Sequence, residues 1–394
     1  MALFSRVLRR ASPLIQKRFN STVSSLTKDE MLVLLRPPFS RWSNIIREAE
    51  KVLGYPTSFM NLRCLLSDEF ANLALYLRKV VGSNHLVMQT AKNVLYGDSK
   101  NLQPWGLVIL LLSKSVKTAN TKACEKQRKL AELTEMLRTG HLIHRKIVNV
   151  PYSRRSKDTD SIIFGNKIAI LLGDYLLVTA NAMLANLKHS EVLYIVSTAT
   201  KDLSESEFFG DRDEQNRPLP GKPKITKDDL DITFDTSAID EEDVLGKPKK
   251  EWTARTVYNG VSLLGRGCQS AMVLNEQSRE IQRIAYNFGC HVGLSWQAAA
   301  EIKKVTEKHR FCLTSAPVLF ALENNPDLYK IIDRAKNDVK DIDYEDLKFN
   351  ILKTDAIDKT EMLREEHAKK AMMYIDNIGQ NESVDMIKKL INTY

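Results

Sequence analysis

The sequence predicts an all-α protein, a large bundle of roughly ten or more helices. Glycine and proline, the residues that interrupt helices, are scarce, with 16 and 12 in 394 residues. Apolar residues recur at intervals of three and four, which places them on one face of a helix, and the alternating pattern typical of strands is rare. The clearest sets are Leu130, Leu133, Met136 and Leu137; Ile281, Ile284, Ala285 and Phe288; and Ala368, Ala371, Met372 and Ile375.

Residues 1–28 have the composition of a mitochondrial transit peptide. They contain arginine, lysine and serine but no acid, and apolar residues are interleaved with them. Arg6, Arg9 and Arg10 interrupt any apolar run long enough for a secretory signal. A basic tail without a targeting role has the same composition and stays open as the alternative. The helical domain is predicted to occupy residues 40–394.

Composition excludes several classes of function. The net charge is +9, but residues 1–28 hold six of these positive charges, so the rest of the chain does not predict nucleic-acid binding. The five cysteines are widely spaced and no CxxC pair occurs, which argues against a zinc ribbon or a thioredoxin-type motif and fits a reduced compartment. His141 and His144 have the spacing of two metal ligands on a helix, but no third ligand lies near them in the sequence.

No apolar run is predicted to span a membrane, which requires about 20 residues. Residues 105–112 are too few, and residues 168–184 are interrupted by Asp174 and Asn181. We therefore expect a soluble protein, with peripheral contact with the inner mitochondrial membrane as its one form of membrane association.

Residues 210–250 break the helical pattern. This segment contains four prolines and a run of acids, and no apolar periodicity continues through it. Such a composition predicts a disordered acidic loop inserted between two helices. Its acids would either be solvated or dock a basic partner.

Four segments together resemble one enzyme family, and they occur in the family's order. Residues 130–144 resemble the helix that leads into the family's "LIHDDVID" motif. The other three resemble its "GxKxAVLAGDYLL", "YGxxLGLAFQ" and "LATGPVLFAL" motifs, and they are residues 164–177, 288–297 and 313–322. The chain is thereby identified as similar to all-trans polyprenyl diphosphate synthases over residues 40–394.

The resemblance implies the isoprenoid-synthase fold, a large helical bundle around a central cavity. Active members of that family condense isopentenyl diphosphate with an allylic diphosphate. They hold Mg²⁺ with carboxylates from two DDxxD motifs on facing helices, because Mg²⁺ is a hard ion that binds oxygen ligands. The first and last aspartates of each motif are four residues apart and share a helix face.

The first motif has lost its acids in this chain. Its three aspartate positions hold Arg145, Lys146 and Asn149. A site of −3 charge has become one of +2, and cations repel Mg²⁺. The resemblance therefore implies that this motif is degenerate and binds no metal.

The second motif is also degenerate. Its aspartate positions hold Ala300, Glu301 and Lys304, so Glu301 is the one acid left among the six positions of both motifs. We expect no catalytic residue and no metal ligand in this chain. Mg²⁺ is expected only in a catalytic partner subunit.

Other family elements are partly retained. The isopentenyl-diphosphate motif keeps Arg63 of its basic residues, and the arginine pair after the first motif is matched by Arg154 and Arg155. These three arginines are the candidate diphosphate contacts. The family's "KT" pair is replaced by Asn259 and Gly260.

This pattern of loss resembles a non-catalytic subunit that pairs with a catalytic member of the family. We expect a stabilising or regulatory subunit of a heteromeric polyprenyl diphosphate synthase in the mitochondrial matrix, making the ubiquinone side chain. Two alternatives remain. The chain could bind or sense a prenyl diphosphate through Arg145, Lys146, Arg154 and Arg155. It could also be a weakly active prenyltransferase, with Asp174, Glu207 and Glu301 as metal ligands.

Overall fold

A computed structural model describes residues 41–57, 104–116, 121–150, 157–224, 234–307 and 310–393. Helices account for most of these residues and no strand occurs among them, so the predicted all-α class is confirmed. The predicted transit peptide, together with Arg63, Arg154 and Arg155, lies outside the described residues.

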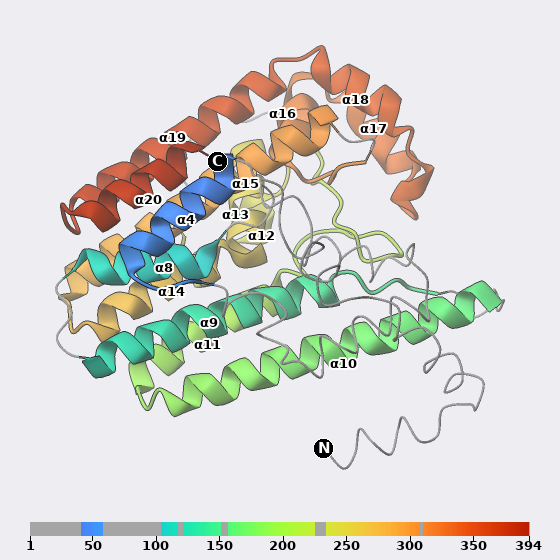
Figure 1. Ribbon diagram of the computed structural model, residues 1–394. Helices are drawn as coiled ribbons and strands as arrows, with labels where there is room; N and C mark the ends of the chain where they lie inside the picture. Colours follow the sequence, from blue (N-terminus) through green and yellow to red (C-terminus); the bar gives the residue numbers. More distant parts are fainter. Residues whose placement is uncertain are drawn as a thin grey trace.

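The helices are labelled in chain order in Figure 1. They are α4 (Arg41–Leu53), α8 (Trp105–Ser115), α9 (Thr121–His144), α10 (Lys157–Asn186), α11 (Ser190–Glu205), η3 (Thr236–Ala238), α12 (Glu241–Val244), α13 (Pro248–Thr256), η4 (Val257–Val261), α14 (Ser262–Leu274), α15 (Arg279–Glu307), α16 (Ala316–Asn324), α17 (Asp327–Arg334), η5 (Val339–Asp341), α18 (Tyr344–Leu352), α19 (Ala356–Asp376) and α20 (Glu382–Thr393).

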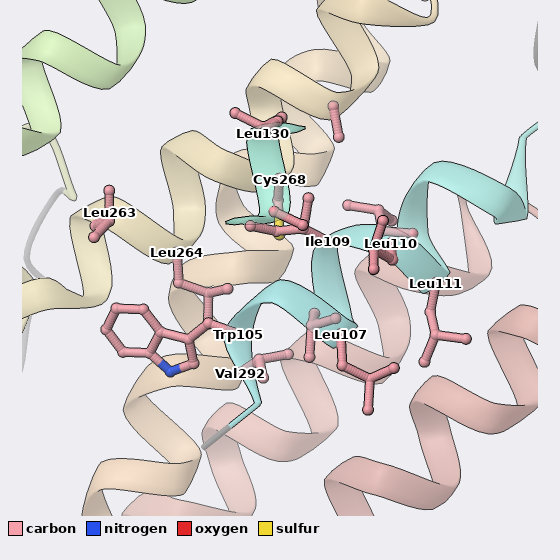
Figure 2. Packing of buried hydrophobic residues seen from close by; sticks show 14 of the residues in the cluster. Trp105, Leu107, Ile109, Leu110, Leu111, Leu130, Leu263, Leu264, Cys268 and Val292 are labelled. Atoms are coloured by element: carbon pink, nitrogen blue, oxygen red, sulfur yellow. The ribbon is translucent and has the colours of Figure 1, made fainter. Parts of the chain in front are cut away.

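Helix α8 lies at the centre of the largest apolar core. Its sequence is apolar on nearly all sides, as expected for a helix surrounded by others. Figure 2 shows Trp105 and Ile109 of this helix among side chains such as Leu264 and Cys268 of α14. These side chains are almost completely removed from water, so α8 fixes the neighbouring helices around it.

Helices α9 and α10 run side by side along one edge of the bundle (Figure 1). Two glycines permit their close approach. A methyl group on Gly140 would lie 3.2 Å from the carbonyl oxygen of Gly173, and one on Gly173 would lie 2.1 Å from Nε2 of His144. Gly173 therefore has a packing role, since a residue without a side chain leaves room for the His144 ring.

The prediction that residues 210–250 are disordered is wrong for residues 210–224 and 234–250. Several of their acids cap short helices: Asp235 accepts from the backbone N–H of Ser237, and Asp240 accepts from that of Glu242. The buried carboxylate of Glu251 accepts hydrogen bonds from the backbone N–H groups of this segment at distances of 2.8–3.2 Å. Acids that cap helices and acids that are solvated look alike in a sequence, which explains the error.

One face of α10 exposes several large apolar side chains, with the charged side chains of Lys167 and Asp174 among them. Ile163, Ile170, Leu171 and Val178 lie on it, and Val178 is 67% exposed. Residues Ile162–Asn186 are long and apolar enough to cross a membrane by length and composition, contrary to the sequence-based expectation. The other face of α10 packs against α9, as in the core of a bundle, so the exposed face requires a separate explanation.

Candidate functional site

A cavity of about 870 Å³ lies among the ends of several helices. Its walls come from the end of α9, the loop after α11, the π-helical turn η4 and the last turns of α15. The segment between α15 and α16 also lines it, together with Val339 of η5 and Tyr344 of α18. Residues of both degenerate motifs line it, including Arg145, Asn149, Glu301 and Lys304. The structure therefore brings the two motifs to one cavity, as the resemblance implied.

Helix α9 ends at His144, one residue before the first motif position. Residues 145–146 form a turn, and residues 147–150 are not helical. Val148 and Val150 are β-branched, and Pro151 disfavours helical conformation at the residue before it. Positions 145 and 149 therefore do not share a helix face here, which corrects the expectation taken from the family pattern.

Arg145 is held by groups of this chain. Its Nε lies 3.0 Å from Oε1 of Glu207, in the turn that follows α11. Its NH1 donates to Oδ1 of Asn259 at 2.5 Å, and Nε2 of His141 lies 3.3 Å from the same oxygen. Burial and the charge of Arg145 lower the pKa of His141 to about 4, so His141 is neutral near pH 7.

The position of Asn259 depends on an irregular helical turn. The five residues of η4 interrupt the helical path, and within it Asn259 and Gly260 leave helical geometry. Gly260 has φ +133°, and a methyl group there would lie 2.9 Å from the ring of Trp105. Only glycine fits both constraints. The turn places the Asn259 amide beside Arg145.

Asn149 is joined to the loop after α11. Its backbone N–H donates to Oε1 of Gln215 at 2.9 Å, and its carbonyl oxygen accepts from Nε2 of Gln215 at 3.0 Å. Its own side-chain amide donates to the carbonyl oxygen of Glu214 at 2.7 Å. Asn149, at the third aspartate position of the first motif, thus joins that motif to the loop after α11, and both line the cavity.

The carboxylate of Glu301 is held by hydrogen bonds within this chain. Its carboxylate accepts hydrogen bonds from Nε1 of Trp252 and from the backbone N–H of Ala316, at 2.7 and 2.9 Å. Gln297 donates a third at 2.7 Å. Ala316 is the first residue of α16, whose N-cap Ser315 makes no side-chain capping bond, so Glu301 caps that helix. Burial raises the pKa of Glu301.

The arginines around the cavity are largely neutralised by neighbouring acids. The pairs are Arg212 NH1 with Glu207 Oε2 at 3.3 Å, Arg217 Nε with Asp213 Oδ2 at 2.8 Å, and Arg255 Nε with Glu251 Oε1 at 2.8 Å. An incoming polyanion would have to displace these acids, which costs the energy of each existing contact.

The residues at the two motifs do not fit Mg²⁺. The first motif offers a guanidinium, an ammonium and one amide, and hard divalent ions prefer several carboxylates. The acids proposed as substitute ligands are not gathered either. Glu207 pairs with arginines, Glu301 with Trp252, and Asp174 lies 3.3 Å from His144. Within the described residues, no three His, Cys, Asp or Glu side chains are placed to hold a metal ion.

Some contacts of the site could not be recognised in the sequence. In the sequence Asn259 is recognisable only as a replaced family residue, and Gln215 falls in a segment whose composition predicts disorder. Both are more than 60 residues from their partners in the chain. No local pattern signals such a pairing.

The chain is similar to known proteins over most of its length. The family model described as polyprenyl synthetase matches residues 85–347. The chain is 35% identical to the Mus musculus protein named all trans-polyprenyl-diphosphate synthase PDSS2, over 72% of this chain and 69% of that one. It is 31% identical to the Homo sapiens protein of the same name, over 89% of this chain and 87% of that one.

More distant similarities agree with these. A Yarrowia lipolytica protein named probable hexaprenyl pyrophosphate synthase, mitochondrial, is 23% identical over 91% of this chain and 90% of that one. The crystal structure of heptaprenyl diphosphate synthase from Staphylococcus aureus matches with a TM-score of 0.57 at 18% identity, covering 83% of this chain and 97% of that one. The structural match supports the predicted isoprenoid-synthase fold.

Proposed function

The chain belongs to the polyprenyl synthetase family, and on this premise we propose that it is a non-catalytic subunit of an all-trans polyprenyl diphosphate synthase. Its partner is a catalytic subunit that retains both aspartate-rich motifs and binds Mg²⁺. The complex acts in the mitochondrial matrix and makes the prenyl side chain of ubiquinone. The composition of residues 1–28 and the mitochondrial relative support this location.

The first motif gives the strongest support for this proposal, because none of its three aspartate positions holds an acid. Arg145 stands where the family has an aspartate, and it is engaged by Glu207 and Asn259 of the same chain. A metal ion at this position would meet a cation in place of a carboxylate. Because ionising an allylic diphosphate requires that metal, the chemistry is assigned to the partner.

The exposed apolar face of α10 is proposed as the surface that binds the catalytic subunit. Ile163, Ile170, Leu171 and Val178 recur over about four helical turns, a length of roughly 22 Å. Exposed Lys167 interrupts this face, but so many large exposed apolar side chains on one helix favour an interface. Exposed Asp174 lies on the same side of the helix, and a charged group there favours a protein partner over a lipid bilayer.

Co-purification tests this assignment. Ile170→Glu with Leu171→Glu should reduce recovery of the full-length chain with a tagged catalytic subunit by at least tenfold, since charges would be buried in an apolar contact. Met362→Glu is the matched control, because Met362 is 70% exposed on α19, at the opposite edge of the bundle in Figure 1. Undiminished recovery of the α10 variant with the catalytic subunit would contradict the assignment. Binding of the wild-type chain to vesicles, lost in the α10 variant, would identify a membrane surface in place of a partner.

A further inference from the structure

Residues 206–219, here called the bridging loop, leave the end of α11 and form one wall of the cavity. The loop contacts two other parts of that wall. One is the degenerate first motif, residues 145–149, and the other is the segment of residues 337–339 that follows α17. These parts are far apart in the sequence, and the loop contacts both of them.

The shape of the bridging loop is fixed by its own groups. The carboxylate of Asp213, which is buried, accepts from the backbone N–H groups of Gln215 and Arg217 at 3.0 and 2.7 Å and from Nε of Arg217 at 2.8 Å. The N–H of Leu219 donates to the carbonyl oxygen of Asp211 at 2.8 Å. A loop with this many internal hydrogen bonds behaves as a rigid unit.

The first attachment is to residues 145–149. Gln215 uses its side-chain amide to satisfy both the N–H and the C=O of Asn149, in the manner of a paired strand. Glu207 binds Arg145 through one carboxylate oxygen, and its other oxygen accepts from Asn216 at 3.1 Å. Contacts at Asn149 and at Arg145 therefore both hold the first motif against the loop.

The second attachment is to residues 337–339. The N–H of Glu214 donates to the carbonyl oxygen of Asn337 at 3.0 Å, and the N–H of Val339 donates to Oδ2 of Asp213 at 3.2 Å. Arg217 also forms an ion pair with Asp338. The same short run of the loop thus binds both neighbours, since the N–H of Glu214 meets Asn337 while its carbonyl oxygen, like Gln215, meets Asn149.

We propose that the bridging loop is a built-in clamp, which holds residues 145–149 and 337–339 in one arrangement without any bound ligand. The basic residue at the first motif is part of the clamp, because Arg145 forms an ion pair with Glu207 of the loop. The cavity wall consequently has a single conformation set by the chain itself. This inference rests on the contacts of the loop and is independent of the subunit role proposed above.

Hydrogen–deuterium exchange on the full-length chain, resolved to single amides, tests the clamp. Gln215→Ala removes the acceptor of Asn149 directly, so the informative amides are those of Glu214 and Val339, whose acceptors are unchanged. If the loop acts as one unit, both should exchange about 5- to 30-fold faster in Gln215→Ala. Lys201→Gln, which removes an exposed ion pair with Glu205 outside the loop, is the matched control and should leave them unchanged.

Two outcomes would overturn the clamp. In one, Glu214 and Val339 exchange at the wild-type rate in Gln215→Ala although the variant is folded by circular dichroism, so the two attachments are independent. In the other, inorganic pyrophosphate with Mg²⁺ slows exchange of the loop in the wild-type chain, so the arrangement depends on a ligand. The clamp predicts the same wild-type exchange with and without pyrophosphate.

Discussion

Replacing Glu301 by alanine should destabilise the fold, whereas replacing it by glutamine should not. Both Trp252 and Ala316 donate to the same carboxylate oxygen, Oε2, and Gln297 donates to the other. Glu301→Ala strands two buried donors at about 1–3 kcal/mol each, so the free energy of unfolding should fall by about 2–6 kcal/mol. Glutamine can present its one oxygen to both donors, while its NH₂ faces the Gln297 amide, which can turn over. Its cost should stay below about 1 kcal/mol.

The assay is denaturant unfolding of the isolated chain, followed by circular dichroism and repeated from pH 4 to 8. Because burial raises the pKa of Glu301 above its ordinary value of 4.5, the folded state binds more protons than the unfolded state just above that pH. The contribution of Glu301 to stability is therefore largest in acid and declines as the pH rises through the folded pKa. Glu301→Gln should lack this decline. A glutamine variant as unstable as the alanine variant would refute the structural role and point to a required negative charge.

Three further predictions concern the first motif and its surroundings. Gly260→Ala should lower stability by about 1–3 kcal/mol in thermal unfolding, because its positive φ strains alanine; an unchanged melting temperature would contradict the geometry. His141 should titrate near pH 4 by NMR, so stability falls as the pH drops from 6.5 toward 4, and Arg145→Met should raise that pKa. A His141 pKa near 6.5 in the wild-type chain would be incompatible with its burial. Restoring aspartate at Arg145, Lys146 and Asn149 together should give no polyprenyl product in an assay with Mg²⁺ and both substrates, because the second motif remains degenerate. Product from that variant would show that the first motif alone controls activity.

The helical bundle and the two degenerate motifs follow from the sequence because both depend on local features. Spacing of apolar residues reports helix faces, and motif order reports the family. The contacts within the cavity could not be predicted in this way. The pairing of Arg145 with Glu207 and Asn259 joins distant parts of the chain, and arginine looks the same in sequence whether it meets a phosphate or a carboxylate.

The contacts of Glu301 could not be predicted from the sequence either. As the one acid retained in either motif, it could be interpreted from sequence as a surviving metal ligand. The structure turns it toward Trp252 and the start of α16, where its role is to cap a helix. Which way a helical side chain faces at the border between cavity and core depends on neighbours such as Ala316, and the sequence does not specify them.

We propose that this chain supports the reaction without performing it. The most direct test measures polyprenyl diphosphate formed from isopentenyl diphosphate and an allylic diphosphate with Mg²⁺, by the purified chain alone, by the catalytic subunit alone and by the two together. We expect background product from this chain alone and more product from the pair than from the catalytic subunit alone. Product from this chain by itself at a rate comparable to that of the pair would contradict it.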